Sequence, residues 1–93
     1  MEFRWIEWNL EKIAGHGASR DEAEHVVEHA RPPYPRYRED EKLLVWGPTE
    51  SGRLLQVVYL LELDDAVFII HARPLTDNEK RRHRRAQRKR GQR

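Results

Sequence analysis

The spacing of hydrophobic positions changes along the chain, and each change marks a predicted element. Residues 2–7 alternate weakly between apolar and polar side chains, which predicts a short strand or an extended lead-in. Residues 8–14 place apolar side chains at helical spacing. The Gly-His-Gly at residues 15–17 should end this first helix, because glycine reaches the left-handed backbone conformation that a helix end favours.

A second helix is predicted to begin at Ser19, because Ser19 and Glu22 stand at the spacing of a capping box. Alanine and valine recur at i, i+3, i+4 and i+7 within residues 23–30, so one face of this helix should pack inward. Pro32-Pro33 should stop the helix. The charged, proline-rich residues 34–40 then predict a loop.

Three apolar segments follow, and short turns separate them. A strand over residues 42–46 leads into a turn at residues 47–52. Residues 53–63 are apolar on both alternating faces, which is typical of a central strand covered on both sides. The last strand is predicted over residues 66–72, and the short turns favour an antiparallel meander. The predicted order is β-α-α-β-β-β-α, an α+β domain with two helices packed on an antiparallel sheet and a basic C-terminal helix.

Simple alternation assigns the side chains of the last strand to two faces. One face holds Phe68, Ile70 and Ala72, and the other holds Val67, Ile69, His71 and Arg73. Arg53 opens the antiparallel neighbouring strand, so we expect its side chain to lie near that of Arg73.

Charge divides the chain sharply. Residues 1–79 hold 9 cations and all 16 acids, a net charge of −7, whereas residues 80–93 carry +9. We therefore divide the chain into a single α+β domain over residues 1–79 and a basic helix or tail over residues 80–93. Thr76 and Glu79 form a second capping-box pattern at the start of this helix. Because almost no apolar residue follows, we expect order near Thr76 and fraying beyond about Arg85.

Length and composition exclude several classes of protein. Ninety-three residues favour one small domain, and the absence of cysteine excludes a disulfide scaffold and any thiolate metal site or nucleophile. No apolar run reaches the length of a signal peptide or a membrane span. We therefore expect a soluble, cytoplasmic protein without a membrane partner.

Three stretches carry a family resemblance, in this order. They are Trp5 or Trp8 with Lys12 and residues 16–24 (His-Gly-Ala-Ser-Arg-Asp-Glu-Ala-Glu), residues 47–58 (Gly-Pro-Thr-Glu-Ser-Gly-Arg-Leu-Leu-Gln-Val-Val), and residues 69–82 (Ile-Ile-His-Ala-Arg-Pro-Leu-Thr-Asp-Asn-Glu-Lys-Arg-Arg). Through these three stretches, the chain resembles the BrnT-like family, the toxin half of a type II toxin–antitoxin module with a RelE-like fold. The resemblance implies a ribonuclease that acts on RNA and is inhibited by a cognate antitoxin, itself DNA-binding.

Two positions depart from the family pattern. His71 stands where a small hydroxyl residue is usual, and His83 stands where an aromatic residue is usual. Metal-independent RNA cleavage, which requires no cofactor, needs a base, an acid and cations around the phosphate. Our hypothesis is that Arg53 and Arg73 bind phosphate while His83 or His71 transfers a proton. In the alternative, Arg73 pairs with an acid of the domain and His71 only covers the sheet edge.

Further basic residues are candidates for nucleic-acid binding. They are Lys12, His16, Lys80, Arg81, Arg82, Arg84, Arg85 and Arg88. Lys12 and His16 are four residues apart at the end of the first helix, where a purely structural role is the alternative. His25 and His29 also have i, i+4 spacing, but without a remote ligand they indicate a solvated helix face rather than zinc.

Two other kinds of function stay open at this stage. One is a non-catalytic RNA- or DNA-binding module that uses the basic tail for affinity without sequence discrimination. The other is a protein-interaction domain whose acidic body docks a basic partner.

Overall fold

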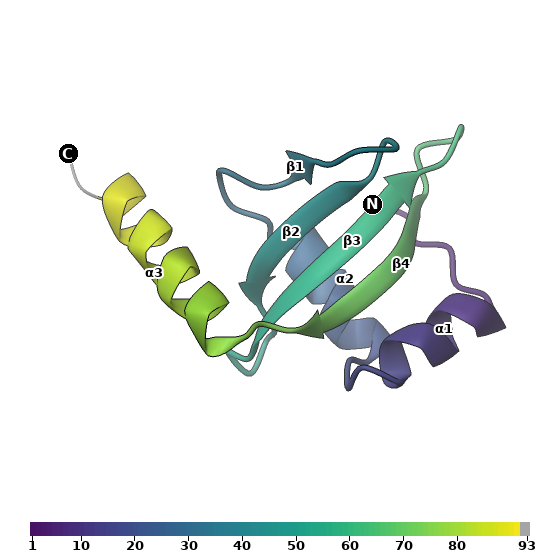
Figure 1. Cartoon of the computed structure of the whole chain (residues 1–93). Helices are drawn as coiled ribbons and strands as arrows, with labels where there is room; N and C mark the ends of the chain where they lie inside the picture. Colours follow the sequence, from purple (N-terminus) through teal and green to yellow (C-terminus); the bar gives the residue numbers. More distant parts are fainter. Residues whose placement is uncertain (92–93) are drawn as a thin grey trace.

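The computed structural model describes residues 1–91, with side chains through Lys89. Its centre is a four-stranded antiparallel sheet in the order β1-β2-β3-β4. The strands are β1 (Arg36–Tyr37), β2 (Leu43–Pro48), β3 (Leu54–Leu61) and β4 (Val67–Pro74), and the helices are α1 (Glu7–Ala14), α2 (Arg20–Glu28) and α3 (Asp77–Gly91). Helices α1 and α2 lie on one side of the sheet, whereas α3 leaves the end of β4 and stands beside β2 (Figure 1).

The predicted α+β class and antiparallel meander are confirmed, but the predicted element order is wrong in two places. The expected first strand contributes only one isolated parallel bridge, between Phe3 and Val67. Conversely, the predicted loop over residues 34–40 contains β1, which pairs with the start of β2. Both differences involve pairing with a distant or following segment, which the local pattern of these residues does not reveal.

The second helix begins as predicted. The Glu22 N–H donates to Ser19 Oγ at 3.2 Å, and the Ser19 N–H donates to Glu22 Oε1 at 3.0 Å, so the capping box is confirmed. The helix ends at Glu28, before Pro32-Pro33, because the backbone already leaves helical geometry at His29. The prediction that the prolines stop it was therefore wrong by about one turn.

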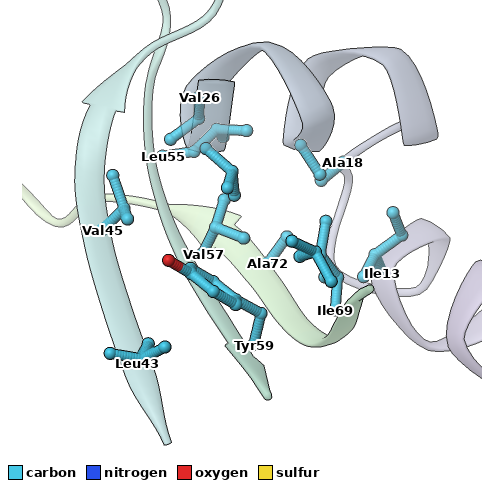
Figure 2. Packing of buried hydrophobic residues seen from close by; sticks show 13 residues of the cluster. Ile13, Ala18, Val26, Leu43, Val45, Leu55, Val57, Tyr59, Ile69 and Ala72 are labelled. Carbon is cyan, nitrogen blue, oxygen red and sulfur yellow. The ribbon is translucent and has the colours of Figure 1, made fainter. Parts of the chain in front are cut away.

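One hydrophobic core fills the space between the sheet and the first two helices. Helix α2 buries Ala23, Val26 and Val27, and α1 buries Ile13 (Figure 2). In β3, five consecutive residues from Leu55 to Tyr59 are buried. The prediction of a central strand covered on both sides is thus confirmed.

A buried asparagine ties three segments together. Asn9 in α1 is 0% exposed, and its Oδ1 accepts the Ile6 N–H at 2.7 Å. Its Nδ2 donates to the Arg4 carbonyl at 3.2 Å and to the Ile69 carbonyl of β4 at 3.0 Å. Because the side chain satisfies one donor and two acceptors, it fixes the lead-in and α1 against the sheet.

The last helix is longer than expected. The Glu79 N–H donates to Thr76 Oγ1 at 3.2 Å and the Thr76 N–H to Glu79 Oε1 at 2.8 Å, so this capping box is also confirmed. The expected fraying beyond about Arg85 is wrong, since α3 is continuous to Gly91 and Gln87 Nε2 donates to the Pro32 carbonyl at 3.3 Å. Residues 92–93 of the predicted tail lie outside the described residues.

Candidate functional site

A β-bulge decides which residues of β4 face outward. Val58 pairs with His71 and Tyr59 pairs with Ile69, so Ile70 is an extra residue on β4. Ile69 and Ala72 are both fully buried in the core beneath the helices. The prediction that Ile69 lies on the face of His71 was therefore wrong, whereas the prediction that Ala72 lies opposite His71 is confirmed. The bulge places His71 and Arg73 on the outer face, opposite Ile69 and Ala72.

A shallow pocket of about 360 Å³ surrounds His71 on this outer face. Four cations line it from three segments of the chain: Lys12 of α1, Arg38 and Lys42 of the β1–β2 hairpin, and Arg73 of β4. Glu39 is the one carboxylate among its lining residues, so the local charge is positive. The ring of His16 lies beside the pocket, with its centroid 5.5 Å from that of His71. The pocket thus combines two imidazoles with several cations, which suits a phosphate group.

Burial lowers the pKa of His71 below its usual value, and the nearby charges of Arg73, His16, Lys12 and Arg38 lower it further. The imidazole is therefore uncharged at neutral pH. A neutral imidazole has a free nitrogen lone pair and can accept a proton from a bound group. The surrounding cations attract an anionic ligand to the same place.

Arg73 is held firmly rather than free. Its Nη1 and Nη2 form a bidentate pair with the Glu79 carboxylate at 2.7 and 2.9 Å, and Nη2 also lies 3.3 Å from Gln56 Oε1. The hydrogen bond from Arg73 lowers the pKa of Glu79 to about 2, so the pair is ionised throughout the neutral range. The structure therefore favours the alternative in which Arg73 pairs with an acid. Its side chain anchors the first turn of α3 to the sheet.

Arg53 does not join Arg73. Its Nη2 donates to the Gly17 carbonyl at 2.7 Å and to Glu22 Oε1 at 2.8 Å, both on the side of α2. Arg73 instead lies opposite Gln56 in the register, on the outer face. The expectation that the two guanidinium groups lie together was wrong, because Arg53 and Gln56 are three residues apart and point to opposite faces. Arg53 fixes the β2–β3 turn to α2.

His83 is the point where α3 meets the sheet. Its side chain is only 7% exposed, and its ring lies 6.0 Å from that of Tyr34 and 6.4 Å, edge-on, from that of Trp46. Its Nδ1 is buried without a hydrogen-bond partner among the described residues. Burial lowers the pKa of His83, and the charge of Arg84 lowers it further. His83 does not reach the His71 pocket, so the two predicted proton-transfer candidates occupy separate places.

Docking of α3 should therefore depend on pH. A histidine whose pKa is lowered by folding resists protonation in the native state, so stability is lost as pH falls below about 6.5. We expect the melting temperature to decrease between about pH 8 and about pH 5, and His83→Phe to reduce that decrease while keeping an aromatic ring. Thermal unfolding across this range measures it. The residual dependence belongs to His71, whose pKa is lowered in the same direction. Equal pH dependence in both proteins would contradict the prediction.

Helical geometry places four of the cations of α3 on the same side of the helix. Arg81, Arg84, Arg85 and Arg88 recur at i, i+3, i+4 and i+7, which places them on one stripe of the helix. All four line a groove of about 870 Å³ between α3 and the body of the molecule. The lining residues from β2 and β3, called the floor below, are Trp46, Gly47, Pro48 and Leu54. Across from α3, the groove is lined by His25, His29 and Arg31. No carboxylate is among its described lining residues.

The other predicted nucleic-acid-binding residues lie outside this groove. Lys12 lines the His71 pocket, with His16 beside it. Lys80 lies 3.9 Å from Asp77, and the Arg82 guanidinium lies over the Trp46 ring at 5.3 Å from its centroid. Neither Lys80 nor Arg82 lines the groove or the pocket in the described part of the chain. The basic side chains of α3 therefore lie on distinct faces of the helix and have different surroundings.

His25 and His29 stack on each other at 4.1 Å between ring centroids, and His29 Nδ1 lies 2.9 Å from the His25 carbonyl. Through the described residues, no three His, Asp or Glu side chains are grouped in a way that could hold a metal ion. The pair lines the basic groove, a position that the sequence pattern did not indicate.

Sequence reasoning also missed Arg38, Lys42, Trp46 and Gln56. Arg38 and Lys42 meet because β1 and β2 form a tight hairpin, in which the Arg38 N–H donates to the Lys42 carbonyl at 2.7 Å. Gln56 is a polar residue within the most apolar strand, and this unusual position could have marked it as a candidate site residue. Its Oε1 accepts the Trp46 Nε1–H at 3.0 Å and faces Arg73, so it links the groove to the pocket.

A comparison of this chain with protein-family models, with curated proteins and with solved structures found no match. Within the described part of the chain, no helix has the length and apolar character needed to cross a bilayer.

Proposed function

We propose that this protein is a metal-independent endoribonuclease, a BrnT-like toxin with a RelE-like fold that a cognate antitoxin inhibits. The observation that carries the catalytic part is the His71 pocket. It holds a half-buried imidazole of lowered pKa among cations from α1, the β1–β2 hairpin and β4. This combination matches what cleavage at an RNA phosphate needs.

The proposed reaction uses the 2′-hydroxyl of RNA as the nucleophile. His71 accepts the 2′-hydroxyl proton, and the 2′-oxygen attacks phosphorus. The bond from phosphorus to the 5′-oxygen breaks, which leaves a 2′,3′-cyclic phosphate and a 5′-hydroxyl. His16, whose ring lies 5.5 Å from that of His71, supplies the proton to the leaving oxygen. Lys12, Arg38 and Lys42 stabilise the negative charge on the phosphorane oxygens.

A cleavage assay tests this function. Purified protein is incubated with single-stranded RNA in excess EDTA, and we expect cleavage to persist and the new 3′ ends to carry cyclic phosphate. The same sequence as DNA is the control, because without a 2′-hydroxyl it should stay intact. Intact RNA in the presence of pure, folded protein would sink the proposal, and so would cleavage that EDTA abolishes.

The antitoxin part of the proposal rests on the family resemblance and is tested genetically. Expression of the chain alone should arrest growth of a host cell, and coexpression of the protein encoded by the adjacent reading frame should restore it. Growth arrest that His71→Ala does not relieve would separate toxicity from RNA cleavage.

A second candidate function is a non-catalytic RNA- or DNA-binding module. The observation that favours it is the stripe of four arginines on α3, which lines a groove without carboxylates. Such a module would bind nucleic acid with a steep salt dependence and leave RNA intact. The cleavage assay therefore discriminates between the two candidates.

A further inference from the structure

The groove between α3 and the body is cationic along α3 and apolar along its floor. Its α3 wall presents Arg81, Arg84, Arg85 and Arg88, which span about 10 Å along the helix. That length exceeds what one phosphate covers, so the wall suits a chain of phosphates. Arginine forks bind phosphate oxygens in pairs, and no described lining residue repels them.

The floor is largely apolar. Gly47 contributes no side chain there, and Pro48 and Leu54 provide apolar surface beside the Trp46 ring. The stacked rings of His25 and His29 lie at the same groove, and so does His83, whose buried Nδ1 has no partner among the described residues. Apolar and aromatic surface beside a cationic wall fits an unpaired base attached to a phosphate chain.

We propose that this groove binds single-stranded RNA, with phosphates along the arginine stripe of α3 and an unpaired base against the floor at Trp46. A duplex fits less well, because its bases are already stacked and cannot reach the floor. An acidic peptide would match the cationic wall but leave the aromatic surfaces without planar partners.

Hydrogen bonds connect a lining residue of the groove to lining residues of the His71 pocket. Trp46 lines the groove, Gln56 and Arg73 line the pocket, and Gln56 Oε1 accepts from both Trp46 and Arg73. One strand of RNA can therefore occupy both, with the scissile phosphate at His71 and its neighbouring nucleotides in the groove. This part rests on the proposed ribonuclease function, and it makes α3 the element that sets affinity and the length of RNA required.

Binding is measured with the His71→Ala chain, so that RNA stays intact during the experiment. A single-stranded oligoribonucleotide should quench tryptophan fluorescence, and Trp46→Phe in the same background should remove most of the quenching. Trp46→Ala, which removes the ring, should weaken binding roughly tenfold. Trp5 and Trp8 remain in each of these proteins and serve as the internal reference. Equal binding of an abasic oligonucleotide, a duplex or a glutamate-rich peptide would overturn the base contact.

The arginine stripe is tested by the salt dependence of the same binding. Arg84→Gln with Arg88→Gln should reduce the slope of log K against log salt by about 1.4, since each single-strand phosphate contact contributes about 0.7. Arg20→Gln on α2 is the matched control, because Arg20 is exposed and lines neither cavity. An equal loss in the control and the double variant would overturn the assignment. Circular dichroism of each variant verifies that α3 still forms.

The two proposals fail in different ways. Quenching and a steep salt slope with RNA that is never cut would exclude the nuclease and keep the groove as an RNA site. Cleavage that is unchanged in rate and length dependence in Trp46→Ala and in the double arginine variant would exclude the groove and keep the nuclease.

Discussion

Replacing His71 with alanine is expected to lower kcat for RNA cleavage by about 10²–10⁴-fold, the usual contribution of a positioned general base. RNA binding should change little, because the cations that hold phosphate are unaltered. The wild-type rate should rise with pH along an acidic limb whose midpoint lies below the usual histidine value, since burial and nearby cations lower the pKa of His71. Single-turnover rates across the pH range measure both effects.

Two comparisons make this result specific to proton transfer. His71→Gln keeps a polar side chain of similar reach but cannot titrate, so it should lose the acidic limb as alanine does. Arg20→Ala, on the exposed side of α2, should keep both rate and pH profile. Retention of the acidic limb in His71→Gln would assign the base to another group.

Replacing Asn9 with alanine is expected to reduce the free energy of unfolding by about 3 kcal/mol. The substitution leaves the buried Ile69 carbonyl, and the partly buried Ile6 N–H and Arg4 carbonyl, without their partner. An unsatisfied buried group costs about 1–3 kcal/mol, and the two partly buried groups add to this. Urea unfolding should show a lower midpoint with an unchanged m-value.

Asn78→Ala is the matched control for Asn9. Asn78 is exposed in the first turn of α3, where its Oδ1 accepts from Arg81. Its loss should change stability by no more than about 0.5 kcal/mol, as for most surface positions. A comparable loss from both substitutions would show that burial of Asn9 does not set its contribution.

Elements that depend on interactions between residues close in sequence were predictable from the sequence. Ser19 with Glu22 and Thr76 with Glu79 form the capping boxes that their spacing indicates. The apolar run around Val57 forms the central strand for a similar reason: a segment that is apolar on both faces must be covered on both.

Elements that depend on register were not predictable in the same way. Alternation carries no sign of the extra residue Ile70, so it placed Ile69 and Ala72 on opposite faces, whereas both face the core. The prediction that Arg53 lies near Arg73 was wrong, because it considered only that their strands are neighbours. It did not consider which face of the sheet each side chain occupies. The helical stripe of Arg81, Arg84, Arg85 and Arg88 was available in the sequence, but dense charge in α3 obscured its periodicity.

The candidate site was only partly accessible from sequence. His71 was identified as an unusual residue, yet the cations beside it come from α1 and from a hairpin that was taken for a loop. Arg73 was expected to bind phosphate, but its partner Glu79 also completes a capping box. One carboxylate serves both contacts, and that double use appears only once the helix is placed against the sheet.

The extra residue in β4 has a consequence for recognising distant relatives of this chain. Without Ile70, Ile69 and His71 would be adjacent, and inside and outside positions would alternate regularly on both sides of the junction. A homologue one residue shorter here can therefore keep the same interior and the same outward histidine and arginine. An alignment that forbids a gap between Ile69 and His71 would compare interior positions of one protein with surface positions of the other, and their kinship would go unnoticed.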